Sequence, residues 1–70
     1  MPIWIVNATW LEDDAEVREQ WQVNAETVQE AVRDVMAHIR FQPHHVETRL
    51  ETNESGSDLA VGEARRLVRT

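Results

Sequence analysis

The 70-residue sequence contains no cysteine. Disulfide bonds are therefore excluded, and so are thiolate zinc sites and thiol redox chemistry. Lysine is absent as well, so the seven basic residues are all arginine, against 13 acidic residues and a formal net charge of −6. This negative balance disfavours binding to phosphate backbones and to anionic membranes. We therefore expect neither nucleic acid nor membrane as a partner.

Long apolar runs are also absent, the longest at the N-terminus being "IWIV". This run is too short for a membrane span or for the core of a signal peptide, and we expect a soluble, cytoplasmic protein. The length predicts a single domain over residues 1–70. A domain this small buries only about 60% of the surface that its unfolded chain exposes. Oligomerisation or a tightly packed core must then supply stability.

The segment "PIWIVNATW" has the branched and aromatic content of a strand and is apolar on both faces in its first half. The segment "EVREQWQV" alternates between apolar and polar side chains, and the acidic turn "LEDDAE" lies between the two, so residues 3–23 predict a β-hairpin. The helix predicted next spans residues 25–41, with Asn24 as its N-cap and Pro43 shortly after its end. The alternative is one long helix from the acidic turn to Phe41, on which the apolar residues also share a side. The hairpin is favoured because the long helix would place Asn24 near its middle.

The segment "HVETRLET", residues 45–52, alternates again and predicts a third strand with one solvated face. For the tail, residues 58–69, an apolar stripe favours a helix over a fourth strand, although Gly62 lies inside it. The predicted class is α+β: a small single-layer sheet packed by one main helix. Its order is β-β-α-β, followed by a C-terminal helix or fourth strand.

Tryptophan occurs three times, and two of these residues lie in the first predicted strand. Alternation places Trp4 and Trp10 on one face of that strand, and Ile3 and Ile5 on the other. One helix can cover only one of these faces. We therefore expect Ile3, Ile5, Trp4 and Trp10 to form an interface, in which the uncovered set contacts the tail or another subunit, with a homo-oligomer as the simplest assembly.

Three histidines occur within the ten residues "HIRFQPHHVE". His38 has no histidine four residues away, and the adjacent His44 and His45 point to opposite faces of a strand. At most two imidazoles can converge, with Asp34 or Glu47 as a further ligand for zinc. A polar helix end explains the pattern better. We predict no metal site and no cofactor, since the sequence also lacks a glycine-rich phosphate loop.

Pro2 becomes the N-terminal residue if the initiator methionine is removed, and its secondary amine could then act as a base near neutral pH. In "MPI", the helix ending near "FQP", the strand "HVETRLET" and the segment "LAVGE", the chain resembles the 4-oxalocrotonate tautomerase family. The resemblance implies Pro2 as catalytic base, with Arg49 or Arg18 binding a substrate carboxylate. The glycine-arginine signature of that family is replaced here by "WLEDDAE".

The favoured function is therefore a non-catalytic protein-binding or assembly module. The tautomerase-like enzyme is the alternative.

Overall fold

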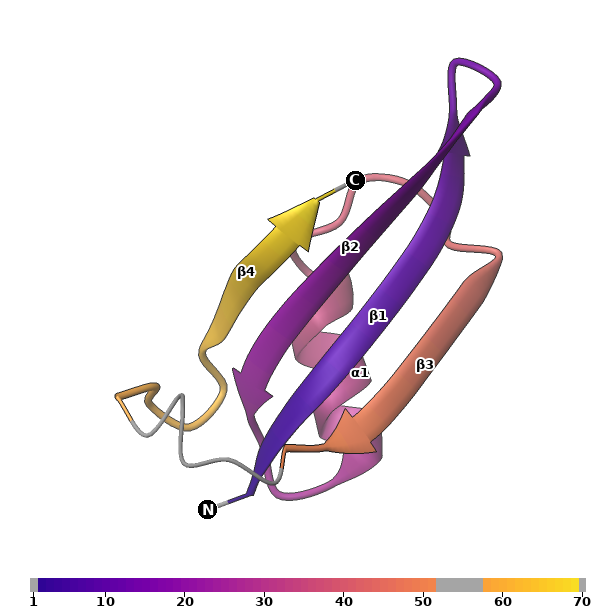
Figure 1. Ribbon diagram of the computed structural model, residues 1–70. Helices are drawn as coiled ribbons and strands as arrows, with labels where there is room; N and C mark the ends of the chain where they lie inside the picture. The colour runs from indigo at the N-terminus through magenta and orange to yellow at the C-terminus, as the bar shows by residue number, and fades with distance from the viewer. Residues whose placement is uncertain (1, 52–57, 70) are drawn as a thin grey trace.

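The computed structural model describes residues 2–51 and 58–69 and has the α+β architecture predicted from the sequence: one antiparallel four-stranded sheet and one helix. The strands are β1 (Ile3–Glu12), β2 (Ala15–Asn24), β3 (His45–Leu50) and β4 (Ala64–Arg69), and the helix α1 is Val28–Met36. The order across the sheet is β3-β1-β2-β4. Figure 1 shows the two long central strands flanked by the short outer ones, with α1 behind the sheet.

The hairpin of β1 and β2 is as predicted, and its register runs from Ile3 opposite Asn24 to Glu12 opposite Ala15. Asp13 and Asp14 make the turn, with φ angles of 53° and 64°. Two consecutive positive φ angles define a type I′ turn, whose twist matches that of the flanking strands. The acidic turn therefore has a direct conformational role, and the single long helix is not formed.

The predicted helix over residues 25–41 is too long at both ends. Thr27 is the N-cap, and its hydroxyl accepts a hydrogen bond from the backbone N–H of Glu30 at 3.2 Å. Asn24, predicted as the cap, is still the last residue of β2, where its side chain is buried and donates to the carbonyl of Leu59 at 2.9 Å. The helix ends at Met36, and the following loop continues along the sheet.

The tail forms strand β4, which is the second of the two structures considered for it. Gly62 has a φ of 84°, which a helix does not allow, and its N–H donates to the carbonyl of Asn24. From this turn β4 runs antiparallel to β2, with one register irregularity at Gln20/Trp21. The apolar stripe that favoured a helix is a local pattern, whereas pairing with the free side of β2 satisfies backbone groups of both segments.

The core lies between α1 and the face of the sheet that carries Trp4 and Trp10. Side chains of β1, β2, α1 and the loop between β2 and α1 form its buried centre, namely Val6, Trp21, Val23, Ala25, Ala31 and Val35. Beyond the helix end, Phe41 stacks on Trp10 with ring centroids 6.0 Å apart. The loop after α1 thus extends the cover over this face toward the hairpin turn.

Candidate functional site

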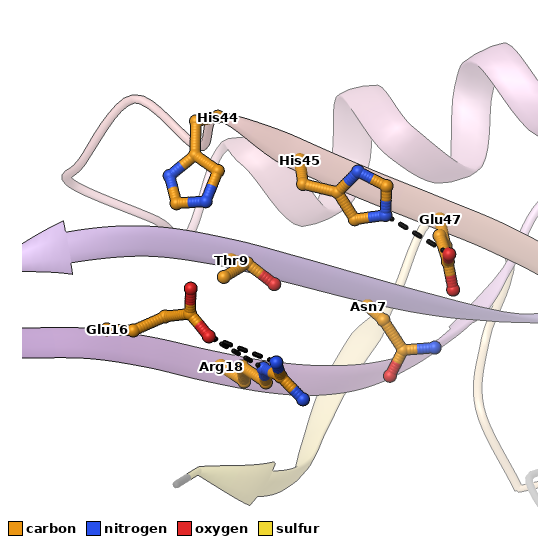
Figure 2. Close-up of a pocket in the computed structure, with 7 residues that line it drawn as sticks. All are labelled: Asn7, Thr9, Glu16, Arg18, His44, His45 and Glu47. Atoms are coloured by element: carbon orange, nitrogen blue, oxygen red, sulfur yellow. Dashed lines mark hydrogen bonds and ion pairs between the residues drawn. The ribbon is translucent and has the colours of Figure 1, made fainter.

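The face of the sheet opposite α1 carries a polar hollow of about 360 Å³. Asn7 and Thr9 of β1 lie at its centre, because alternate side chains of a strand point to the same face. The strands on either side supply charged residues in register, with Arg18 opposite Thr9 on β2 and Glu47 opposite Asn7 on β3. Figure 2 shows side chains of three adjacent strands around this hollow, together with His44, which precedes β3.

At this polar hollow, Arg18 and His45 each contact a carboxylate. Arg18 lies 3.0 Å from Glu16, and the Nε2 atom of His45 lies 3.1 Å from Glu47 Oε1. Both pairs are largely exposed, so each contributes only about 0–1 kcal/mol to stability. Among the described contacts, no hydrogen bond joins the Thr9 hydroxyl to an imidazole, the arrangement that would activate a nucleophile. The hollow thus presents hydrogen-bonding side chains, Asn7 and Thr9 among them, on the face opposite α1.

The three histidines do not converge. His38 lies on the helix side of the sheet, where its ring stacks on Trp21 at 5.2 Å. His44 and His45 lie at the polar hollow on the opposite face, and the backbone N–H of His44 donates to the Thr9 carbonyl. The residues described by the structure contain no cluster of three or more metal-ligating side chains.

A second hollow, of about 320 Å³, lies beyond the helix end and includes Trp10, Phe41 and Arg69 in its lining. Arg69 donates to Glu12 at 2.7 Å and to Glu19 at 2.9 Å. Glu19 has a side chain only 4% exposed and also accepts from Arg66. The sequence did not predict this charged cluster, because it depends on β4 pairing with β2.

The four residues predicted as an interface lie in different environments. Ile5 and Trp10 are buried within the isolated chain, and Ile3 is partly buried. Trp4 is also partly buried and donates its indole N–H to the carbonyl of Ala25 at 2.9 Å. Their contact with another subunit stays a prediction. The exposed apolar side chains of the sheet are others, including Val46 and Leu50 of β3.

The residues that the tautomerase resemblance implied, Pro2, Arg18 and Arg49, lie before β1, on β2 and on β3. Pro2 precedes β1, and its carbonyl accepts a hydrogen bond from Ala25. Arg18 lies opposite Thr9, which is roughly 23 Å along the strand from Pro2 at about 3.3 Å per residue. Arg49 lies opposite Ile5, much nearer to that end. Neither Pro2 nor Arg49 lines either hollow.

The outer side of β3 is the other feature of interest. Within residues 2–51 and 58–69, β3 pairs with β1 alone, so its far side is an edge of the sheet. Its side chains on the helix face include Val46, 36% exposed, and Leu50, 53% exposed, because α1 packs on β1 and β2 instead. An edge that combines unpaired backbone with exposed apolar side chains can accept another strand.

Comparison of the chain with protein-family models, with curated proteins and with solved structures found no match. In the described part of the chain, no helix has the length and apolar character that crossing a membrane requires.

Proposed function

We propose that this protein is a non-catalytic protein-binding and assembly module, and that the edge of β3 is its binding surface. The observation that carries the proposal is the exposure of Val46 and Leu50 beside a strand edge that no described segment covers. Both belong to a strand whose side chains are mostly solvent-exposed. Apolar side chains at such an edge gain stability when an added strand removes them from water.

The backbone of β3 supports the same proposal. The N–H of Glu51 donates to the carbonyl of Ile3 at 2.7 Å, in register with the pairing of β1 and β3. In antiparallel strands, hydrogen-bonded residues alternate, so the odd residues of β3 bond toward β1. The N–H and C=O groups of Val46, Thr48 and Leu50 then point outward. A strand docked there would form main-chain hydrogen bonds, as in recognition by β-augmentation.

The polar hollow supports a binding role more than a catalytic one. His45 and Glu47 belong both to the hollow and to β3, so an added strand would lie beside these polar side chains. Charged and polar groups next to an edge supply specificity and orientation for a partner more than affinity. The tautomerase-like alternative receives less support, because Pro2 and Arg49 line neither hollow. It predicts that Pro2→Ala abolishes a keto-acid tautomerase activity.

The test is a selection of peptides from a displayed random library of extended ten-residue segments, with the protein immobilised at low concentration. The selected peptides are then measured against Thr48→Pro, which removes an outward N–H while proline remains tolerated at a sheet edge. We expect Thr48→Pro to abolish binding. Arg18→Ala, in the polar hollow but away from the edge, serves as the matched control and should bind as the unmodified protein does.

Peptides that bind Thr48→Pro and the unmodified protein equally would contradict the edge as the binding surface. Loss of binding in Arg18→Ala alone would instead place recognition in the polar hollow. Circular dichroism of each variant verifies that the fold is retained.

A further inference from the structure

We infer that the partner that the β3 edge fits best is a second copy of this chain, paired antiparallel to it about a two-fold axis at Thr48. This inference rests on the proposed function and names its partner. A two-fold axis makes each contact occur twice, so a strand that pairs with its own copy must be self-complementary about its centre. The sequence of β3 has this property.

With Thr48 opposite Thr48 of the second copy, Glu47 lies opposite Arg49 and Val46 lies opposite Leu50. Residues directly opposite in an antiparallel pair share a face and have Cβ atoms about 4.5–5.5 Å apart. The apolar pairs therefore meet on the helix face, and the charged pairs on the opposite face. Opposite charges and apolar pairs in such positions each contribute roughly 0.2–1 kcal/mol relative to alanine pairs.

The same register suits the backbone. Val46, Thr48 and Leu50 are the residues whose N–H and C=O groups point outward from β3, as the alternation from the Glu51–Ile3 hydrogen bond requires. Pairing Thr48 with Thr48, and Val46 with Leu50, joins outward groups to outward groups. Both the hydrogen bonds and the side chains thus select one register.

Neighbouring registers are disfavoured. If the second strand shifted by one residue, each helix-face residue of β3 would lie opposite a residue from the other face of the second copy. Directly opposite residues share a face in an antiparallel pair, so this register does not keep the two-fold arrangement. Moving the axis to Glu47 places that carboxylate against its own copy, and moving it to Arg49 places two guanidinium groups together. Like charges directly opposite one another destabilise a strand pair.

The other edge of the sheet does not fit a copy of itself. Three of the residues of β4 are arginine, namely Arg65, Arg66 and Arg69. Antiparallel pairing of two β4 strands would crowd these cations, and like charges on an edge strand oppose such pairing. The cations of β4 are also engaged within the chain, with Asp58, Glu19 and Glu12. We therefore expect the chain to self-associate through the edge of β3 and not through the edge of β4.

The resulting dimer has one continuous antiparallel sheet with both helices on the same face, since opposite residues in paired strands share a face. Pairing would cover Val46 and Leu50, the exposed apolar side chains of β3. Among the described residues, Arg49 has no ion-pair partner. In the dimer, the Glu47 carboxylate of the second copy would become its partner. A contact through one short strand belongs to the small, weak class of interfaces, below roughly 1,200 Å².

Charge reversal tests this register. Glu47→Arg places arginine opposite Arg49 of the second copy, and Arg49→Glu places glutamate opposite Glu47. Sedimentation equilibrium, extended to several hundred micromolar, should show the unmodified chain dimerising. Each variant alone should have a dissociation constant raised roughly tenfold or more, as expected from two repulsive pairs. Mixing the two variants should restore dimers, because both pairs are then of opposite charge. Circular dichroism verifies that both exposed substitutions retain the fold.

Two outcomes would overturn the inference. One is a chain that stays monomeric at the highest concentration. The other is a dimer that both variants retain and that mixing does not strengthen, which would place the contact elsewhere. Neither outcome affects the peptide selection, which can still show an edge that accepts strands of other proteins. Conversely, peptides that bind Thr48→Pro as well as the unmodified protein would contradict the proposed function, whether or not the chain dimerises.

Discussion

Glu19 of β2 links its strand to β4 through side-chain contacts with Arg66 and Arg69. Its nearly buried carboxylate accepts hydrogen bonds from Trp21 at 3.0 Å, Arg66 at 3.2 Å and Arg69 at 2.9 Å. Hydrogen bonds to a charged group contribute about 1.5–3 kcal/mol each in favourable cases, and less where the partner is half exposed, as both arginines are. The buried charge is tolerable because several donors surround it.

We predict that Glu19→Gln lowers the free energy of unfolding by about 1–2 kcal/mol. For a chain of this size, that corresponds to a fall in Tm of roughly 4–16 °C. Thermal denaturation followed by circular dichroism measures it. Glu16→Gln, on the same strand but in the exposed pair with Arg18, is the control and should change stability by less than about 1 kcal/mol. Equal effects of the two substitutions would contradict the role of burial.

Asp58 is the carboxyl group with a resolved shift among the described residues. Its hydrogen bond with Arg65, at 2.8 Å, holds the pKa of Asp58 below its ordinary value of 3.8. A lowered folded-state pKa means that this interaction stabilises the fold above the ordinary pKa. The contribution is lost as the pH falls from near 3.8 through the lowered value.

We predict that Arg65→Gln returns the pKa of Asp58 toward 3.8, measured by NMR titration of its carboxyl carbon. Arg66→Gln is the matched control, since Arg66 contacts Glu19 rather than Asp58, and it should leave that titration unchanged. An unshifted Asp58 in the unmodified chain would contradict the contact with Arg65.

At the scale of elements, the β1–β2 turn stores conformational strain. Asp13 and Asp14 have positive φ angles, which disfavour residues with a Cβ atom by about 1–2 kcal/mol, less for aspartate. Glycine adopts such angles freely, although it loses more conformational entropy on folding. Asp14→Gly should therefore stabilise the protein by about 0.5–1 kcal/mol and raise Tm by a few degrees.

Gly62 offers the converse substitution. Its φ is 84°, and a Cβ atom there would meet only Asp34 Oδ2, at 4.0 Å. Gly62→Ala should therefore destabilise the protein through backbone strain, by about 1 kcal/mol, and not through a steric clash. Chemical denaturation of both variants measures the two opposite changes. A loss of stability in Asp14→Gly would contradict the I′ geometry of the turn.

The elements that the sequence predicted well are those with local causes. The branched and aromatic content of the first strand and the alternation of the second are both local patterns, and they sufficed for the hairpin. The predicted start of the helix was wrong. Asn24 is a favourable N-cap by residue type, but its backbone N–H donates to the carbonyl of Glu63, far along the chain. The helix favoured for the tail was wrong for the same reason, since the pairing of β4 with β2 is a long-range interaction that a local stripe does not reveal.

For the candidate sites too, what the sequence could predict depended on whether the cause of a feature is local. The face of β3 that carries His45, Glu47 and Arg49 followed from alternation. The expected separation of His44 from His45 was wrong, because His44 precedes β3 and both histidines line the polar hollow. The stack of His38 on Trp21 and the arginine cluster around Glu19 could not be predicted. Both need the placement of the loop after α1 and of β4, which no short-range pattern specifies.

For the whole molecule, size links stability to assembly. A chain of 70 residues buries a smaller fraction of its surface than a larger domain does, and its net charge of −6 opposes compactness and association alike. The proposed β3 pairing is locally neutral, because Glu47 meets Arg49, so it does not add to this repulsion. Dimerisation involves only folded chains, so it raises the apparent stability of the fold by mass action. The increase grows with the logarithm of the protein concentration divided by the dissociation constant of the dimer.

We therefore predict that the Tm of the unmodified chain rises with protein concentration, whereas that of Thr48→Pro stays constant. Once the concentration exceeds the dissociation constant, each tenfold increase strengthens the association term by about 1.4 kcal/mol per mole of dimer formed. Differential scanning calorimetry over a hundredfold concentration range measures the slope. Glu47→Arg, a second variant with the edge backbone intact, should reach this slope only at a concentration roughly tenfold higher or more, and its equimolar mixture with Arg49→Glu should regain the behaviour of the unmodified chain. A slope retained by Thr48→Pro would mean that association stabilises the protein through a surface other than β3.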